Sequence, residues 1–359
     1  MNVMTPLPAI PVLDLRDGGP LRQASEGRQR ARALRDDCLA WLPRGSAAAL
    51  PLLDAVARRW LRRSRSPYLG EIDAIAAMLG FPGIWFLNAS YQWGCTTLAR
   101  DEDGTPWLAR TLDWPFPGLG RHAEVARLQG PAGDFYSVTW PGYVGALTAM
   151  APGRFAAAIN QAPLRRRTTH HWLRVADLAI NAAGTWRNRQ IPPDQLLRQV
   201  FETCGSFAEA RAMLEATPIA RPVIYVLVGC TAGERCVIER TEEEFSTSTE
   251  ATCATNDWMP RRPGWEGRIA AEKLFSCSFE QAAEGSIMRR DALAGWRAPL
   301  PAVDFAWVTP PVLNPYTRLA AAMCPASGTL RVCGYEHVPG TELPQPVTQA
   351  CEVTAPLAA

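Results

Sequence analysis

The sequence predicts an α+β fold in which antiparallel sheets are covered by helices. Helical periodicity dominates the first 94 residues and returns between about 170 and 216, whereas the segments between and after these read as short strands. Consecutive strands are joined by turns of Gly, Pro and acidic residues, so they form hairpins rather than β-α-β units. The composition of 47% hydrophobic and 20% charged residues is that of a globular protein.

The N-terminal region predicts one short strand followed by helices. The strand spans 10–15, and apolar residues at three- and four-residue spacing then predict helices over 25–42, 47–63 and 70–79. The last of these ends at Gly80-Phe81-Pro82-Gly83, a sequence that breaks helices.

The remainder predicts hairpins on either side of a helical block. A strand, a tight turn at 101–105 and a second strand follow Trp93. Further strand pairs are predicted at 123–129 with 135–139, 143–150 with 154–161, 223–230 with 235–240, and 318–323 with 329–335. Helices are predicted over 170–187, 193–203 and 206–216. Without an internal repeat or a clear linker, the 359 residues are expected to form one domain.

Composition excludes several classes of function. The net charge, 37 − 35 = +2, is too small to indicate a nucleic-acid partner, and no stretch is apolar enough to span a membrane. The start lacks a secretory signal, and the ten cysteines form no C-x-x-C pair, so a reducing cytoplasm is expected. The four histidines have no metal-ligand spacing with cysteine pairs, so neither a metal nor a cofactor is predicted.

Cys95 differs from the other nine cysteines in its surroundings. It begins the first strand of the 101–105 hairpin and faces Arg110 and Asp113 on the second. A guanidinium beside a thiol lowers its pKa, which favours the nucleophilic thiolate. Residues three apart point to opposite faces of an ideal strand, so a bend at the strand end is expected where Arg110 and Asp113 act together. No histidine lies nearby in the sequence to serve as a base.

This segment resembles the linear amide C–N hydrolases of the N-terminal nucleophile superfamily, which include acid ceramidase, N-acylethanolamine acid amidase, choloylglycine hydrolase and isopenicillin N acyltransferase. The shared pattern is Cys95-Thr96-Thr97, Gly104 in the turn, Arg110 and Asp113. Segments 68–94, 141–161, 255–268 and the closing hairpin near 315–335 follow in the family's order, so the resemblance covers most of the chain.

The resemblance implies a four-layer αββα fold and a precursor that cleaves itself before Cys95. The products would be an N-terminal helical segment, 1–94, and a catalytic part, 95–359, of 359 − 94 = 265 residues, which together form one structural domain. Cys95 would then carry both the attacking thiol and a free α-amine. Because an α-amine has a pKa of about 7.7–8.0, it can act as the general base.

The resemblance also assigns roles to the other site residues. Asp113 would bind the α-amine, and Arg110 would hold the thiolate and the carboxylate in place. Asn256 would stabilise the oxyanion together with the side chain or backbone of Asn160, and Arg268 matches a further family arginine. The implied substrate is a small N-acyl amine, such as an N-acylethanolamine or a ceramide-like amide. Gln161 departs from the glutamate of the ceramidase branch.

Three other functions remain open from the sequence. Water or an amine could resolve the acyl-enzyme, so acyl-CoA-dependent N-acyl transfer is an alternative. The chain could also be an unprocessed binding protein, or a thiol hydrolase that uses His122 or His170 as its base. The basic run 57–65 predicts either a solvated helix face or weak contact with lipid. The sequence predicts no oligomeric state.

Overall fold

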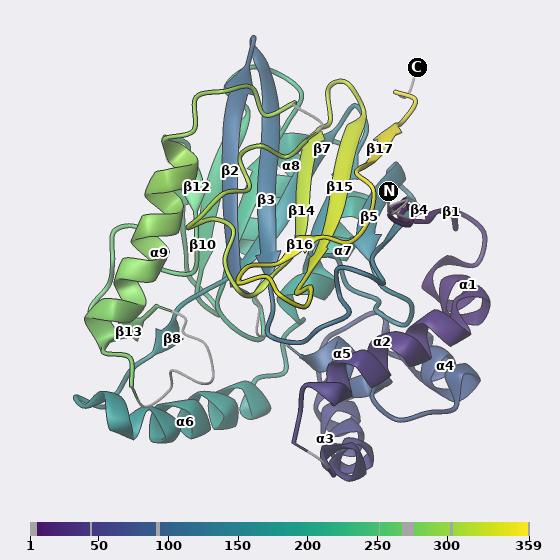
Figure 1. The fold of residues 1–359 in the computed structure, drawn as a ribbon, viewed down its shortest axis with the longest axis vertical. Helices are drawn as coiled ribbons and strands as arrows, with labels where there is room; N and C mark the ends of the chain where they lie inside the picture. The colour runs from purple at the N-terminus through teal and green to yellow at the C-terminus, as the bar shows by residue number, and fades with distance from the viewer. Residues whose placement is uncertain are drawn as a thin grey trace.

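Two β-sheets stacked face to face form the centre of the structure (Figure 1). The structure is a computed structural model that describes residues 6–43, 45–90, 94–250, 252–267, 276–301 and 304–357. The first sheet has the strand order β1 (Val12–Asp14), β4 (Glu124–Gly130), β5 (Gly133–Thr139), β6 (Thr148–Ala151), β7 (Phe155–Gln161), β9 (Val223–Val228), β10 (Arg235–Arg240) and β11 (Phe245–Ser248). All its neighbours are antiparallel except β1 and β4.

The second sheet lies nearer the viewer in Figure 1 and contains the predicted Cys95 hairpin. Its order is β12 (Cys253–Ala254), β2 (Gly94–Glu102), β3 (Thr105–Asp113), β14 (Thr317–Cys324), β15 (Thr329–Glu336) and β16 (Gln345–Pro346), with β17 (Cys351–Thr354) also on β15. A separate pair joins β8 (Leu164–Arg165) to β13 (Trp265–Glu266).

Helices cover the outer faces and one end of this sandwich. Those at the end are α1 (Gly19–Glu26), α2 (Arg28–Ala40), η1 (Ser46–Ala49), α3 (Leu50–Leu61), α4 (Leu69–Leu79) and α5 (Ile84–Ala89). The others are η2 (His171–Leu173), α6 (Arg174–Arg187), α7 (Pro193–Thr203), α8 (Phe207–Ala216) and α9 (Phe279–Ala294). Helices α7 and α8 pack on the first sheet and α9 on the second, which confirms the αββα layers (Figure 1).

The central strands are buried on both faces, and their composition explains this. All six residues of β9 and all eight of β14 are buried, and both strands read as nearly continuous apolar runs. One apolar cluster fills the space between the sheets, while a second, which includes Leu98, Trp107 and Leu293, lies between the outer face of the second sheet and α9. Each sheet is therefore shielded from water on both sides where the central strands lie.

The structure corrects several predicted elements, including the helix predicted over 25–42, which is divided at Gly27 into α1 and α2. Strand β6 begins only at Thr148, because Gly142 adopts a φ of +92° and Gly145 packs so tightly on Asp194 that a Cβ would lie 2.3 Å from its Oδ2. Helices α5 and α9 were not predicted, and α9 is preceded by a capping box between Ser278 and Gln281. Among the described helices, none has the length and apolar character needed to cross a bilayer.

Candidate active site

The β2–β3 hairpin places Cys95 and Arg110 on one face of the second sheet and Asp113 on the other. Cys95 pairs with Leu112, Thr97 with Arg110, and Gly94 with Asp113. Because paired residues point to the same side of an antiparallel ladder, Cys95 and Arg110 face the first sheet and Asp113 faces α9. The expected bend does not bring the two charged residues together. Instead a register shift at Thr317–Leu319 in the neighbouring strand β14 accommodates the end of β3 at Asp113.

The Cys95 sulfur lies between the two sheets and is completely buried. It accepts a hydrogen bond from Arg110 Nη2 at 2.8 Å and one from the backbone N–H of Gln161, and it donates to the Ile159 carbonyl at 3.4 Å. Arg110 is itself held by Leu147 O at 2.7 Å and Thr148 Oγ1 at 2.6 Å. The guanidinium that contacts the thiol therefore has a fixed orientation.

Burial raises the pKa of the Cys95 thiol above its ordinary value. The positive charge of Arg110 acts in the opposite direction but does not outweigh the loss of water around the sulfur. The expectation of a lowered thiol pKa is therefore wrong for this arrangement. Burial therefore favours the thiol over the thiolate, and a base is needed to remove its proton before the sulfur attacks.

The side chain of Asn256 contacts the backbone of Cys95. Asn256 is fully buried just after β12, and its Oδ1 accepts the Cys95 backbone N–H at 2.9 Å. Its Nδ2 donates to Gln161 O at 2.8 Å, so the amide bridges β2 and β7. The structure thus brings Asn256 to the hairpin that carries Cys95 and Arg110, although Asn256 follows Cys95 by 161 positions.

Asn160 supports the Asn256 segment instead of contacting Cys95 with its side chain. Its Nδ2 donates to Ala254 O at 2.9 Å and Thr255 O at 3.2 Å, and its Oδ1 accepts from Thr97 Oγ1 at 2.6 Å. The backbone donor next to the sulfur comes from the following residue, Gln161.

Asp113 is buried beside Gly94 on the outer face of the second sheet. Its Oδ1 accepts from Thr317 Oγ1 at 3.0 Å, and its Oδ2 accepts from Asn314 Nδ2 at 2.8 Å. A Cβ added to Gly94 would lie 3.1 Å from Asp113 Cβ and 3.6 Å from Asp113 Oδ2. The carboxylate therefore lies against the residue that precedes Cys95.

Arg289 on α9 is a site residue that the sequence reasoning missed. Its Nη1 donates to Cys95 O at 2.9 Å and forms an ion pair with Asp113 Oδ2 at 3.2 Å, while its Nη2 donates to Asn256 Oδ1 at 3.0 Å. It thereby connects the two faces of the hairpin end. Arg268, which was predicted as the further arginine, lies outside the described residues.

A signal for Arg289 exists in the sequence of α9. The buried residues of this helix recur at helical spacing, at Phe279, Ala282, Ser286 and Leu293, and Arg289 falls in the gap of this stripe. A charged residue on the buried side of a helix needs a buried partner. Asp113 supplies that partner.

Neither histidine proposed as an alternative base is among the described contacts of the Cys95 sulfur. His122 Nε2 lies 2.9 Å from Asp37 Oδ2, and the His170 ring stacks on Trp172. Within the described ranges, no cluster of His, Cys, Asp and Glu has the arrangement of a metal site.

An apolar pocket of about 600 Å³ lies among the N-terminal helices next to the end of the hairpin. Leu34, Cys38 and Leu87 are among the residues that line it, and Trp114, which directly follows Asp113, forms part of its wall. Leu53 and Phe86 also line it and are exposed, so the pocket opens to the surface between α3 and α5. Its size and lining are those of a site for an apolar ligand.

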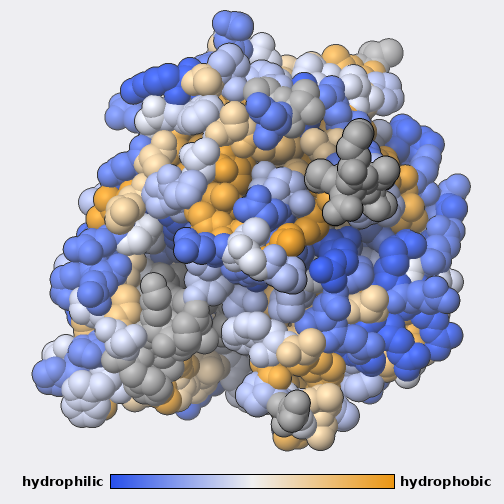
Figure 2. All heavy atoms as spheres, viewed as in Figure 1, coloured by the Kyte–Doolittle hydropathy of each residue, from blue (hydrophilic) through white to orange (hydrophobic). Residues whose placement is uncertain are grey.

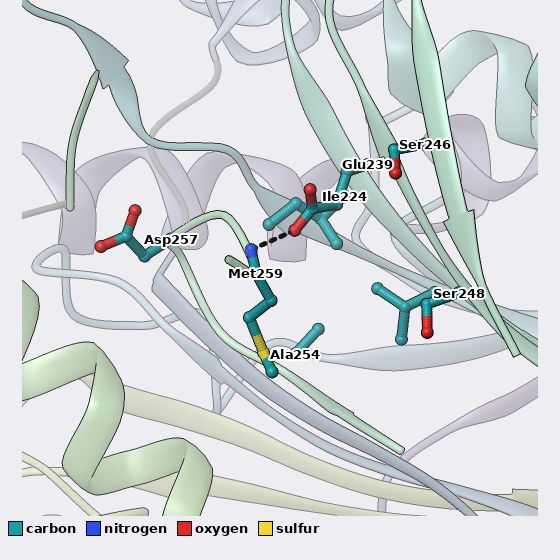
Figure 3. A pocket seen from close by; sticks show the side chains of 8 residues that line it. Ile224, Glu239, Ser246, Ser248, Ala254, Asp257 and Met259 are labelled. Atoms are coloured by element: carbon teal, nitrogen blue, oxygen red, sulfur yellow. Dashed lines mark hydrogen bonds between the residues drawn. The ribbon is translucent and has the colours of Figure 1, made fainter. Parts of the chain in front are cut away.

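A second, much smaller cavity of about 20 Å³ lies on the inner face of the first sheet near its β11 edge. Glu239 on β10 and Asp257, the residue after Asn256, both line it (Figure 3). The dashed line in Figure 3 marks the hydrogen bond from the Met259 backbone N–H to the Glu239 carboxylate.

Curated proteins of similar sequence include an acid amidase and acid ceramidases. The chain is 26% identical over 202 residues to the N-acylethanolamine-hydrolyzing acid amidase of Oryctolagus cuniculus, covering 54% of this chain and 53% of the relative. It is 26% identical over 220 residues to a probable acid ceramidase of Caenorhabditis elegans and 30% identical over 195 residues to the acid ceramidase of Balaenoptera acutorostrata scammoni, covering 52% and 47% of those proteins and 54% and 48% of this chain.

This chain is similar to acid amidases and acid ceramidases. The resemblance stated from the Cys95 segment is thereby confirmed, and the chain spans about half the length of the curated relatives it matches. No family model matches it. A solved structure of a Caenorhabditis elegans N-acylethanolamine-hydrolyzing acid amidase ortholog aligns with a TM-score of 0.46 at 16% identity, covering 65% of this chain and 93% of the other.

Replacing Arg289 tests the importance of the ion pair with Asp113. Arg289→Met removes the charge from a side chain that is 13% exposed and leaves the 4% exposed Asp113 carboxylate without its cation. We expect the free energy of unfolding to fall by about 3 kcal/mol, as when one partner of a buried pair is lost. Arg290→Met is the control, because Arg290 pairs with the exposed Asp291, and it should change stability by less than about 1 kcal/mol. Equal effects in urea denaturation would contradict the assignment.

Proposed function

We propose that this protein is a self-processing cysteine amidase that hydrolyses the amide bond of small N-acyl amines. Cleavage between Gly94 and Cys95 would separate segment 1–94 from the catalytic part 95–359, and the two would remain packed together as one domain. The observation that carries the proposal is that two hydrogen bonds orient Cys95. Arg110 binds its sulfur on one side, while Asn256 binds its backbone nitrogen on the other.

Self-cleavage uses the same atoms. The sulfur of Cys95 attacks the Gly94 carbonyl carbon, the thiol proton passes to the Cys95 nitrogen as the C–N bond breaks, and water then hydrolyses the thioester to leave Gly94 with a carboxylate. Asn256 Oδ1 already accepts a hydrogen bond from that nitrogen at 2.9 Å and can continue to hold it as an amine. The departure of Gly94 also frees the space beside Asp113 Oδ2 for the new amine.

The new α-amine provides the base that the buried thiol requires. Because burial raises the pKa of the Cys95 thiol, the nearby guanidinium of Arg110 alone does not ionise it. An amine with a pKa of about 7.7–8.0 on the same residue can accept the thiol proton near neutral pH. The thiolate attacks the substrate carbonyl, the amine product leaves with that proton, and water resolves the acyl-thioester. In this proposal the oxyanion is bound by the Gln161 backbone N–H, which contacts the Cys95 sulfur, and by Asn256 Nδ2, which donates to Gln161 O in this structure and would turn to the oxyanion during the reaction.

The apolar pocket supports an aliphatic acyl group as part of the substrate. It reaches from the surface between α3 and α5 to Trp114, next to the end of the hairpin that carries Cys95. A hydrocarbon chain that binds there is removed from water, which favours binding by about 25 cal/mol per Å² of apolar surface buried. The names of the relatives, an amidase that hydrolyses N-acylethanolamines and ceramidases, agree with such a substrate.

A lipid surface is the proposed location of that substrate. On α3 the side chains of Leu52 and Val56 are 68% and 47% exposed, and on the η2–α6 segment Trp172 is 58% exposed. Apolar side chains are visible at the lower end of the molecule in Figure 2, where α3 and α6 lie in Figure 1.

Charge complementarity favours an anionic membrane. Arg59, Arg62 and Arg65 of the basic run 57–65 are exposed next to this apolar surface. Arg58 and Arg62 both form ion pairs with Asp73, and Arg63 lies over the Trp186 ring, so Arg59 and Arg65 are the arginines of the run that would meet an anionic surface first. The contact with lipid is therefore extended from 57–65 to include Leu52 and Val56.

Replacing Cys95 tests the nucleophile and the cleavage together. Cys95→Ala should leave an intact chain without amidase activity, and Cys95→Ser should cleave slowly, because a hydroxyl can make the same attack. The control is Cys324→Ala, which removes another buried thiol at the end of β14 and should process and react normally. Intact-mass measurement and N-terminal sequencing give the result. Cleavage of the Cys95→Ala variant at the 94/95 bond would refute self-processing.

Filling the pocket tests the acyl site. Cys38→Phe places a ring where the Cys38 side chain lines the pocket, and we expect KM for long-chain N-acyl amines to rise about tenfold, as for typical overpacking, while short-chain substrates change little. Cys38→Ser is the control of similar size. An equal change for short and long acyl chains would contradict this location.

Vesicle binding tests the lipid surface. Leu52→Glu with Val56→Glu should weaken co-sedimentation with anionic phosphatidylserine vesicles by about tenfold or more, because two carboxylates replace apolar side chains next to an anionic surface. Leu357→Glu, at an exposed apolar residue elsewhere, is the control. Unchanged sedimentation of the double variant would exclude this surface.

A further inference from the structure

We propose that Glu239 is a positioning residue that holds the Asn256 segment in place from the opposite sheet. The inference rests on the proposed function, since it concerns how accurately Asn256 is placed next to Cys95. It assigns to Glu239, on β10 of the first sheet, a role in a site whose nucleophile belongs to the second.

The Asn256 segment needs support because its strand is short. Strand β12 contains only Cys253 and Ala254, which pair with Leu98 and Thr97 of β2, and the chain then leaves the sheet. On the side before Asn256, the Asn160 amide binds Ala254 O and Thr255 O. Residues 257–262, which follow Asn256, belong to none of the described strands. They therefore require a different anchor.

Glu239 supplies that second anchor through both carboxylate oxygens. Its Oε1 accepts the Met259 backbone N–H at 2.5 Å, three residues after Asn256 (Figure 3). Its Oε2 accepts from Arg262 Nη2 at 2.9 Å. The Arg262 guanidinium in turn lies 4.9 Å from the ring of Trp258, which is buried. Residues 258–262 are therefore tied to β10 at two points.

The charges around Glu239 make this anchor depend on its ionisation. Arg262 is the cation that faces it and Asp257 is the nearby anion, which is itself paired with Arg261 at 3.1 Å. The residues paired with it on β9 and β11, Ile224 and Ser246, carry no charge. Burial, mainly, raises the pKa of Glu239 to about 6. The carboxylate is therefore ionised at neutral pH and neutral in mildly acidic solution.

Because the pKa of Glu239 is raised, the effect of its charge on the position of the segment can be measured separately from its effect on the stability of the fold. An acid with a raised pKa in the folded state contributes stability when it is protonated, and this contribution is lost as the pH rises through the pKa of about 6. Glu239→Gln, which is neutral at every pH, should therefore fold at neutral pH at least as well as the wild type. What it loses is the charged acceptor for Arg262.

Hydrogen exchange of the peptide 255–262, followed by mass spectrometry, tests the anchor without any assay of activity. At about pH 7.5 the backbone amides of Glu239→Gln should exchange roughly tenfold faster than those of the wild type, because a charge-assisted pair is lost. At about pH 5, where the wild-type carboxyl is also protonated, the ratio should approach about one. Glu242→Gln is the matched control, since Glu242 pairs with Arg165 at 2.7 Å away from this segment.

Kinetics then test the consequence for the reaction. At about pH 7.5 Glu239→Gln should lower kcat about tenfold with KM nearly unchanged, because a small displacement of Asn256 weakens binding of the oxyanion more than binding of the substrate. Arg262→Gln should have a similar effect, and the double variant should be no worse than either single one.

Two results would overturn the inference. One is an exchange ratio near one at about pH 7.5. The other is faster exchange with an unchanged kcat, which would leave Glu239 a structural role only. If the wild type has no amidase activity, the proposed function fails, whereas the exchange experiment still decides whether Glu239 anchors the segment.

Discussion

The enclosure of Cys95 between two sheets is the constraint on which the rest of the site depends. At the surface, water would solvate the thiolate form of a cysteine, whereas the Cys95 sulfur is in contact with protein groups only. Its neighbours are the guanidinium of Arg110, the carbonyl of Ile159 and the N–H of Gln161, each fixed by a strand or by further hydrogen bonds. Burial favours the neutral thiol, and therefore any chemistry at this sulfur needs a proton acceptor within its own immediate surroundings.

The two arginines of the site, Arg110 and Arg289, make their hydrogen bonds across boundaries between layers. Arg110 extends from the second sheet to the Leu147 carbonyl and the Thr148 hydroxyl, which lie at the start of β6 in the first sheet. Arg289 extends from α9 to Asp113, the Cys95 carbonyl and Asn256. A buried charge that loses its partner is costly, so these contacts also fix how helix, sheet and sheet are packed. The groups that orient Cys95 and the groups that hold the layers together are to a large extent the same.

The N-terminal helices have a different relation to the site. They contribute no contact to the Cys95 sulfur among the described residues, but they form most of the apolar pocket that leads toward the hairpin end. A helical segment before the nucleophile can therefore shape the substrate site even though the reactive groups lie after it. This division suits the proposed cleavage, because a segment that contributes a wall must remain bound after the peptide bond is broken.

The sequence by itself determined the local features. Strand alternation, turn residues and helical spacing predicted the hairpins, most helices and the Cys95-Arg110-Asp113 pattern, because these depend on neighbours in the chain. Only the tertiary structure decided that no bend brings Arg110 and Asp113 to one face, that burial raises the thiol pKa, that Arg289 contacts Asp113, and that Glu239 binds the segment after Asn256. These features depend on groups that lie up to about 200 positions apart in the chain. A local sequence pattern does not show which of these groups lose their contact with water when the chain folds.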